Sequence, residues 1–275
     1  FDFKQTMLGQ EGKGWFDHSL PTADELKESI FQAHERADSI GVLSTIIENH
    51  DEPRGVSHYI AEGPVNDTSK KALGTIQVLR KGIPFIYQGQ EIGMENQVFE
   101  SVEDFDDIAT INGYHVAKEA GLSEEEALAV IANYSRDNAR TPMQWSREPG
   151  LGFSDGSAWL ISPKPDVAIN VEDQEKDPDS ILNYYRQLTA LYRHPLYGNT
   201  IRFGDMIPAY RDRENIIAFE RRGDKRLLVI SNFQNRQGTL ELPAPIKTVV
   251  LNNTAGLFQE GDQVLELTPY QTVVL

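Results

Sequence analysis

A short stretch near residue 50 brings acid, amide, imidazole and guanidinium groups together. Residues 48–54 read ENHDEPR and directly follow 41–47, GVLSTII, a β-branched run typical of a strand buried on both faces of a parallel sheet. Two interpretations stay open from this stretch alone. Asn49 and Asp51 can form a turn at the strand end through bonds to their own backbone. Alternatively, the His50 imidazole and the Asp51 carboxylate can bind and process a substrate.

Three more polar side chains follow a second predicted strand. The sequence GIPFIYQGQEIG predicts a second strand, over 83–87, followed by a turn that carries Gln88, Gln90 and Glu91. Because the carboxyl ends of parallel strands meet at one edge, we expect both turns to share a rim. Glu91 could equally cap a helix. RDNAR, residues 136–140, could be a solvated loop whose exposed arginine–aspartate pair contributes little.

Helices are predicted around both strands. Residues 21–39 carry a capping box, Thr22 with Glu25, ahead of apolar residues at helical spacing. Residues 67–81 predict a second helix, with Leu73 among its inward positions. Helices that alternate with strands at this spacing are typical of βαβ units and a parallel sheet.

The pattern becomes irregular over 94–178. An acidic stretch precedes a helix that Ser123 and Glu126 open with a capping box, and a loop rich in Pro, Gly and Asp follows. So long an excursion is uncommon in a compact domain unless it is functional or disordered, and we interpret it as an insertion. An amphipathic helix is predicted over 177–195, with Pro178 in its first turn.

From residue 197 onward the sequence changes to short strands separated by Gly, Asn, Asp or Pro turns. This pattern is typical of an antiparallel β-sandwich. We therefore expect an α/β domain over 1–196, interrupted by the insertion at about 94–178, and a separate β-domain over 197–275.

Composition limits the classes of partner. The 275 residues contain 42 acidic and 26 basic side chains, a net charge of −16, which argues against nucleic acid or an anionic membrane as partner. Without cysteine, neither a disulfide nor a thiolate metal site can form, and the histidines show no metal-ligand spacing. No signal peptide opens the sequence and no apolar run approaches the roughly 18 residues of a membrane helix. A cytoplasmic location is the resulting expectation.

Three motifs stand in an order that resembles one enzyme family. ENHDEPR, GIPFIYQGQEIG and RDNARTPMQW, followed by a helix and an antiparallel domain, resemble the carboxyl-terminal half of glycoside hydrolase family 13. The likeness is to its oligo-1,6-glucosidase and α-glucosidase branch; RDNARTPMQW is highly specific, and the resemblance spans essentially the whole chain. It implies the C-terminal part of a (β/α)8 barrel followed by an antiparallel β-domain. The opening FDF would be the sixth barrel strand, 41–47 the seventh and 83–87 the eighth.

The resemblance also implies a chemistry. Family members are retaining enzymes, in which one carboxylate attacks the anomeric carbon and a second carboxylic acid protonates the leaving oxygen. A third carboxylate contacts sugar hydroxyls and favours the transition state, and Asp51 matches it. His50 matches the imidazole that hydrogen-bonds the same glucose. Arg140 matches the residue that grips the non-reducing glucose in exo-acting members.

Two of the three acids have no match. The family's nucleophile and acid/base follow the fourth and fifth strands, and Glu48, Glu52 and Glu91 match neither position. The resemblance therefore implies that this chain needs the N-terminal half of the barrel as its partner to catalyse. A calcium-binding loop, where the family has one, would also lie in that half, so we expect no metal or cofactor here. We also expect the partial barrel, with open strand edges, to depend on that half.

Several functions remain open. Substrates of the isomaltose, maltose, trehalose 6-phosphate or sucrose-isomerising type cannot be separated, because the discriminating side chains lie mostly beside the nucleophile. A non-catalytic relative that acts as an interaction protein, as the heavy chains of solute transporters do, is a second class. Intact His50, Asp51 and Arg140 favour the enzyme, with a short α-glucoside oligosaccharide as substrate.

Overall fold

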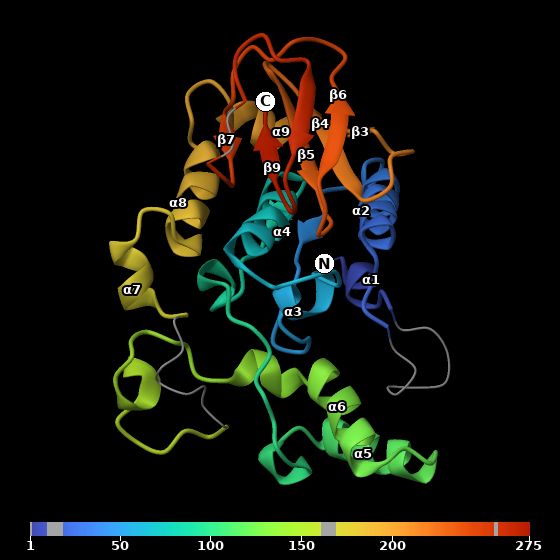
Figure 1. Ribbon diagram of the computed structural model, residues 1–275, viewed down its shortest axis with the longest axis vertical. Helices are drawn as coiled ribbons and strands as arrows, with labels where there is room; N and C mark the ends of the chain where they lie inside the picture. The colour runs from blue at the N-terminus through green and yellow to red at the C-terminus, as the bar shows by residue number, and fades with distance from the viewer. Residues whose placement is uncertain (1, 10–18, 161–168, 256–257) are drawn as a thin grey trace.

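The computed structural model describes residues 2–9, 19–160, 169–255 and 258–275. Figure 1 shows an antiparallel sheet at one end of the molecule and a pair of helices, α5 and α6, at the other. Helices α2, α4 and α8 lie between these ends. In these described ranges, no helix combines the length and the apolar character that a membrane crossing needs.

The elements of the described residues follow the expected order. The α-helices are α1 (Phe3–Thr6), α2 (Ala23–Ala37), α3 (Gly55–Tyr59), α4 (Asp67–Leu79), α5 (Ile108–Glu119), α6 (Glu124–Tyr134), α7 (Val171–Lys176), α8 (Ile181–Leu191) and α9 (Gly198–Phe203). The 3-10 helices are η1 (Gln90–Ile92), η2 (Val102–Asp104), η3 (Arg136–Arg140) and η4 (Pro149–Gly152). The strands are β1 (Ser44–Thr45), β2 (Ile83–Pro84), β3 (Asp205–Ala209), β4 (Ile216–Arg222), β5 (Arg226–Asn232), β6 (Gly238–Glu241), β7 (Leu251–Asn252), β8 (Val264–Leu267) and β9 (Thr272–Val274).

Side-chain caps set the helix boundaries. The capping box predicted for α2 is confirmed: Thr22 Oγ1 accepts the Glu25 backbone N–H at 3.2 Å, and Glu25 accepts the Thr22 N–H in return. The start predicted for α8, residue 177, is wrong by four residues, because the helix begins at Ile181. Its cap is Ser180, whose hydroxyl accepts the Asn183 N–H at 3.2 Å, so Pro178 lies before the helix rather than in its first turn.

The parallel pairing predicted between the two strands is confirmed, over a shorter length. Ser44 pairs with Ile83 and Thr45 with Pro84, in parallel. The Ile83 N–H donates to the Leu43 carbonyl at 2.9 Å, but Pro84 has no N–H to donate. Each strand is two residues long. Residues 46–47 lie between β1 and its polar turn, and residues 85–87 lie between β2 and Gln88.

The strand predicted at the FDF start does not form over its described residues. Phe1 lies outside them, and Phe3 already begins α1. The Asp2 N–H donates to the Ser44 carbonyl at 3.2 Å, which joins this segment to β1. One such bond orders the chain beside the sheet but makes no ladder.

The C-terminal region forms two antiparallel sheets, as predicted. One has the strand order β3-β4-β5-β9-β7, and the other pairs β6 with β8. The strands alternate between two cores, as the pleat requires. Ile216 and Ala218 of β4 belong to a cluster with Leu240 and Leu265 of the small sheet. Phe219 belongs to the main cluster instead.

The main core joins the helices to the C-terminal sheet. Leu26 of α2, Leu73 of α4 and Tyr185 of α8 share one buried cluster with Phe219 and Val229 of the sheet. The inner face of the five-stranded sheet therefore packs against the three helices, which form the middle layer of Figure 1. The hydrophobic core is continuous from the helices into the sheet.

A buried arginine reinforces this junction. Arg221 of β4 is fully buried and donates to the Leu79 carbonyl at the end of α4 and to the Gly204 carbonyl, each at 2.8 Å. A cation at the carboxyl end of a helix meets the negative end of the helix dipole. Burial lowers the pKa of Arg221 to about 10, so the group stays charged at neutral pH.

Close packing of α4 on α8 gives a first prediction. A Cβ at Gly74 would lie 2.7 Å from the Tyr185 hydroxyl oxygen, which Gln90 Nε2 holds at 2.9 Å. Gly74→Ala should lower the free energy of unfolding by about 1–3 kcal/mol through overpacking, despite the better helix propensity of alanine. Urea unfolding followed by circular dichroism measures it. Gly41→Ala, where a Cβ meets open space, is the control and should be nearly neutral. Equal stability of both variants would contradict this packing.

Glu220 gives a pH prediction. Hydrogen bonds from Arg226 and Arg222, at 2.6 and 2.8 Å, hold the pKa of this β4 carboxyl down to about 2. Because the pKa is lowered in the folded state, the ionised carboxyl stabilises that state at pH values above its ordinary pKa near 4.5. This stabilisation is lost as the pH falls towards 2. Allowing for solvent screening, Glu220→Gln should cost on the order of 1 kcal/mol at pH 7.

The Glu220 difference should shrink as the pH is lowered from 5 towards 3. Urea titrations of the wild type and the variant at several pH values test it, with the exposed Glu241→Gln as the control. A difference that stays constant with pH would show that the carboxyl is not held ionised by its arginines.

Candidate active site

The turn after β1 is built by Asn49. Its side-chain oxygen accepts the Asp51 backbone N–H at 2.7 Å, and its carbonyl accepts the Glu52 N–H at 3.3 Å. The turn interpretation of the sequence is therefore correct for Asn49. It leaves the side chains of His50 and Asp51 free to face other elements.

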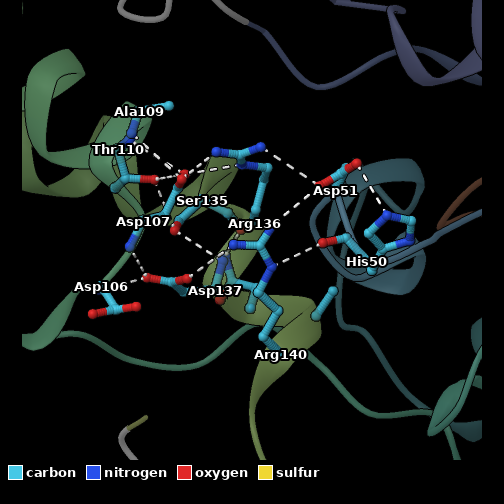
Figure 2. Close-up of polar contacts among 12 residues, drawn as sticks. His50, Asp51, Asp106, Asp107, Ala109, Thr110, Ser135, Arg136, Asp137 and Arg140 are labelled. Atoms are coloured by element: carbon cyan, nitrogen blue, oxygen red, sulfur yellow. Dashed lines mark hydrogen bonds and ion pairs between the residues drawn. The ribbon is translucent and has the colours of Figure 1, made fainter. Parts of the chain in front are cut away.

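The structure brings the three predicted site residues together (Figure 2). Asp51 Oδ1 lies 3.0 Å from Arg140 Nη2 and 3.5 Å from Arg136 Nη1, and Asp51 Oδ2 lies 3.2 Å from His50 Nε2. Arg140 Nε also donates to the His50 carbonyl at 3.0 Å. One carboxylate thus faces two guanidinium groups and an imidazole, although 89 residues separate Asp51 from Arg140.

This cluster is open to solvent. The side chain of His50 is 72% exposed, that of Asp51 49% and that of Arg140 22%. A polar ligand can therefore reach each group directly. In the described part of the chain, no group of three or more histidine, aspartate or glutamate side chains is placed to hold a metal ion.

Arg136, which the sequence analysis did not single out, is held in place by Asp107. Asp107 caps α5 by accepting the Thr110 N–H and hydroxyl, and it pairs with the Arg136 guanidinium. Burial acts to raise the pKa of Asp107, but hydrogen bonds from Arg136 and Thr110 outweigh it, and the pKa is lowered. The bond to Asp107 likewise raises the pKa of Arg136. Arg136 is thus held with its remaining donors towards Asp51.

The 3-10 helix η3 directs its charges to opposite sides. Asp137 is fully buried, and its Oδ2 accepts the backbone N–H groups of Asp106 and Asp107 at 2.8 and 2.9 Å. Asp137 Oδ1 lies 3.7 Å from Arg140 Nη1. The two arginines face Asp51 while the aspartate anchors the segment below them (Figure 2). RDNAR is therefore not the solvated loop that its composition alone allowed.

A buried ion pair holds the three motifs in register. Glu48 and Arg54 are both buried, with 3.2 Å between Glu48 Oε1 and Arg54 Nη1. Glu48 also accepts the Gly55 N–H at 2.6 Å. Arg54 donates to the Gln88 carbonyl at 2.7 Å and to the Asn138 carbonyl at 3.2 Å. The pair thereby ties the turn after β1 to the turn after β2 and to RDNAR. The sequence signal for this pair was a charged residue on each side of NHD, Glu48 and Arg54, and the sequence analysis did not use it.

One predicted rim residue lies in the core instead. Gln90 is buried, and its side-chain amide donates to Gln77 and to the Tyr185 hydroxyl. The left-handed backbone of Gly89, with φ at 87°, starts η1 and turns Gln90 inward. The expectation that both polar turns present their side chains at the rim is thus wrong for Gln90, while Glu91 is partly exposed.

Such a cluster suits neutral, hydroxyl-rich ligands. A carboxylate accepts hydrogen bonds from hydroxyl groups, and guanidinium and imidazole N–H groups donate to them.

Family comparison identifies the chain. The family described as α-amylase, catalytic domain, matches residues 1–196, and the α-amylase SusG C-terminal domain matches 216–274. The chain belongs to the α-amylase family.

Relatives place it more closely within glycoside hydrolase family 13. A probable oligo-1,6-glucosidase of Bacillus subtilis is 36% identical over 248 residues, which cover 88% of this chain and 43% of that protein. The isomaltulose synthase of Klebsiella sp. LX3 superposes with a TM-score of 0.91 at 30% identity, covering 99% of this chain and 49% of the other. The trehalose-6-phosphate hydrolase of Bacillus licheniformis gives a TM-score of 0.90 at 32% identity, covering 99% and 50%.

These comparisons confirm the resemblance seen in the motifs. The chain spans about half the length of the relatives it matches. The structural neighbours are α-amylase-family barrel proteins, and the antiparallel sheets agree with a C-terminal β-domain. The numbering of the barrel strands as six to eight and the domain boundary at 196 remain predictions.

The buried ion pair yields a stability prediction. Arg54→Met leaves Glu48 buried without its cation and should lower the free energy of unfolding by about 3–5 kcal/mol. The double variant with Glu48→Gln should recover part of that loss, because no unpaired charge remains. Arg211→Met, which breaks exposed pairs with Glu28 and Glu35, is the control and should cost under about 1 kcal/mol. Chemical denaturation measures all of them; equal losses for the Arg54 and Arg211 variants would contradict the prediction.

Proposed function

We propose that this chain supplies one side of the active site of a retaining α-glucosidase that hydrolyses short oligosaccharides of the isomaltose and maltose type. The observation that carries the proposal is the solvent-open cluster in which Asp51 faces Arg140, Arg136 and His50. The likeness to a probable oligo-1,6-glucosidase supports the substrate class.

Each side chain has a role in this proposal. Asp51 accepts hydrogen bonds from hydroxyl groups of the glucose whose bond is cleaved. These bonds strengthen as the sugar ring flattens, so they lower the barrier rather than only bind the ground state. His50 donates to the same ring, and Arg140 grips the non-reducing glucose. Arg136, held by Asp107, positions the Asp51 carboxylate.

The nucleophile and the proton donor are proposed to lie outside this chain. Retaining hydrolysis needs two carboxyl groups about 5–5.5 Å apart on either side of the bond. Three acids near the cluster are already engaged: Glu48 by Arg54, Asp107 by Arg136, and Asp137 by backbone N–H groups. By this proposal the chain is inactive alone and becomes active with the N-terminal half of a barrel.

Two activities of the same family are the alternatives. Trehalose-6-phosphate hydrolysis and sucrose isomerisation are favoured by the two solved structures, whose TM-scores are 0.90 and 0.91. All three activities begin by binding a glucosyl unit, so the Asp51 cluster is compatible with each. The cluster does not support a non-catalytic interaction partner, because such a role gives no reason to keep its sugar-binding geometry.

Glucose release is the test of this function. The purified chain is assayed alone and with a fragment that supplies the first five barrel strands, on isomaltose, maltose and trehalose 6-phosphate. We expect release only from the combination. Asp51→Asn should then lower kcat by about 100–1,000-fold, whereas the exposed Asp212→Asn should leave it unchanged.

Two outcomes would overturn the proposal. Release by the chain alone would mean that its own acids serve as nucleophile and proton donor. Full activity of the Asp51→Asn variant in the combination would remove Asp51 from the mechanism. The substrate that is hydrolysed fastest decides between the glucosidase and the trehalose-6-phosphate hydrolase.

A further inference from the structure

Tyr87 connects the buried helices to the 3-10 helix η3. It lies between β2 and Gln88. Its backbone N–H donates to Gln90 Oε1 at 3.2 Å, and the Gln90 amide in turn donates to the Tyr185 hydroxyl in the core. The Tyr87 hydroxyl donates to the Ala139 carbonyl at 3.0 Å, although 52 residues separate the two. The residue is therefore anchored at its backbone and makes its distant contact through its hydroxyl.

The Ala139 carbonyl lies directly before Arg140. The carbonyl and the Arg140 backbone nitrogen belong to one rigid peptide plane. A donor that fixes this carbonyl therefore restricts the direction in which the Arg140 side chain leaves the backbone. Carbonyl groups at the end of a helix lack partners within that helix, and η3 ends at Arg140. The Tyr87 hydroxyl supplies such a partner next to the residue that contacts Asp51.

Arg54 holds both the Tyr87 ring and the preceding carbonyl of η3. Its guanidinium carbon lies 5.5 Å from the centroid of the Tyr87 ring, within the range of a cation–π contact. Its Nε donates to the Asn138 carbonyl at 3.2 Å. Two consecutive carbonyls, those of Asn138 and Ala139, are thus held by a stacked arginine–tyrosine pair. A phenylalanine at position 87 would keep the stacking and lose only the hydroxyl bond.

We propose that Tyr87 is a positioning residue for Arg140. By holding the Ala139 carbonyl, its hydroxyl keeps the Arg140 guanidinium directed at Asp51 and at the His50 carbonyl, which Arg140 Nε reaches at 3.0 Å. A long arginine side chain loses rotamer freedom when it grips a ligand, and a side chain that is already held loses less. Tyr87 therefore prepares Arg140 for the glucose. This inference rests on the proposed glucosidase function.

Hydrogen exchange at Arg140 Nε is the first test. Isotope-labelled arginine in the 275-residue chain lets NMR follow single Nε–H groups, and the signal that disappears in Arg140→Lys is that of Arg140. In the wild type, the bond to the His50 carbonyl should slow exchange of this proton. Tyr87→Phe should speed the exchange by about tenfold, the effect of roughly one hydrogen bond on a local opening equilibrium.

Two controls separate positioning from general loosening. The Arg54 Nε–H should keep its exchange rate in Tyr87→Phe, because the phenyl ring still packs on the guanidinium. Tyr192→Phe removes a comparable bond, from a tyrosine hydroxyl to the Val78 carbonyl at 2.7 Å, and should leave exchange at Arg140 unchanged. An unchanged Arg140 rate in Tyr87→Phe, or equal acceleration of both arginines, overturns the proposal.

A double-variant cycle connects the contact to catalysis. The chain is combined with the fragment that supplies the first five barrel strands, and isomaltose is the substrate. Tyr87→Phe should raise KM about fivefold and leave kcat within about twofold, because a grip on the non-reducing glucose acts on ground state and transition state alike. In an Arg140→Ala background the same change should add nothing, since its effect passes through Arg140. Additive effects of the two variants would show that Tyr87 acts by another route, and would overturn the proposal.

The outcomes distinguish this inference from the function on which it rests. If Tyr87→Phe speeds exchange at Arg140 alone, but the combination releases glucose from no substrate, the proposed function is wrong and the positioning of Arg140 stands. If the combination is active and Tyr87→Phe leaves KM unchanged, the function stands and the positioning role is wrong.

Discussion

The site depends on one buried ion pair. Glu48 and Arg54 stand on either side of Asn49-His50-Asp51, and together they fasten both strand-end turns to RDNAR. Burial raises the pKa of Glu48, so its charge is costly to keep without a partner. A buried pair of this kind contributes specificity of arrangement more than net stability. Here it fixes the contact between the turn after β1, the turn after β2 and RDNAR, and this contact sets the position of Asp51.

A second level of organisation is the layer of helices between the sheet and the site. Their apolar faces share one core with the five-stranded sheet, and Gly74 lets α4 approach α8 until Tyr185 fills the space between them. Tyr185 in turn accepts a bond from Gln90, directly beneath the turn after β2. The packed helices at the centre of the molecule are therefore connected to the rim by a few polar contacts, not by a continuous sheet.

The sequence predicted the order of the elements better than their precise contacts, and the roles of the site residues remain proposals. Capping boxes, parallel pairing and the amphipathic face of α8 follow local rules that hold in the folded chain. Gln90 was misplaced because a left-handed glycine, not strand alternation, decides where its side chain points. Arg54 was missed although its ion-pair partner Glu48 is only six residues away. Arg136 was missed because its partner Asp107 is distant in sequence. Such roles depend on tertiary contacts that periodicity does not encode.

Arg221 has a consequence for how this family can exchange parts. Its guanidinium spans the boundary between sheet and helices by binding the last carbonyl of α4 and the Gly204 carbonyl. A C-terminal sheet recombined from a relative must bring an equivalent donor to that carbonyl, or leave a buried acceptor unsatisfied. A recombined sheet without that donor should therefore lose about 1–3 kcal/mol of stability at this boundary.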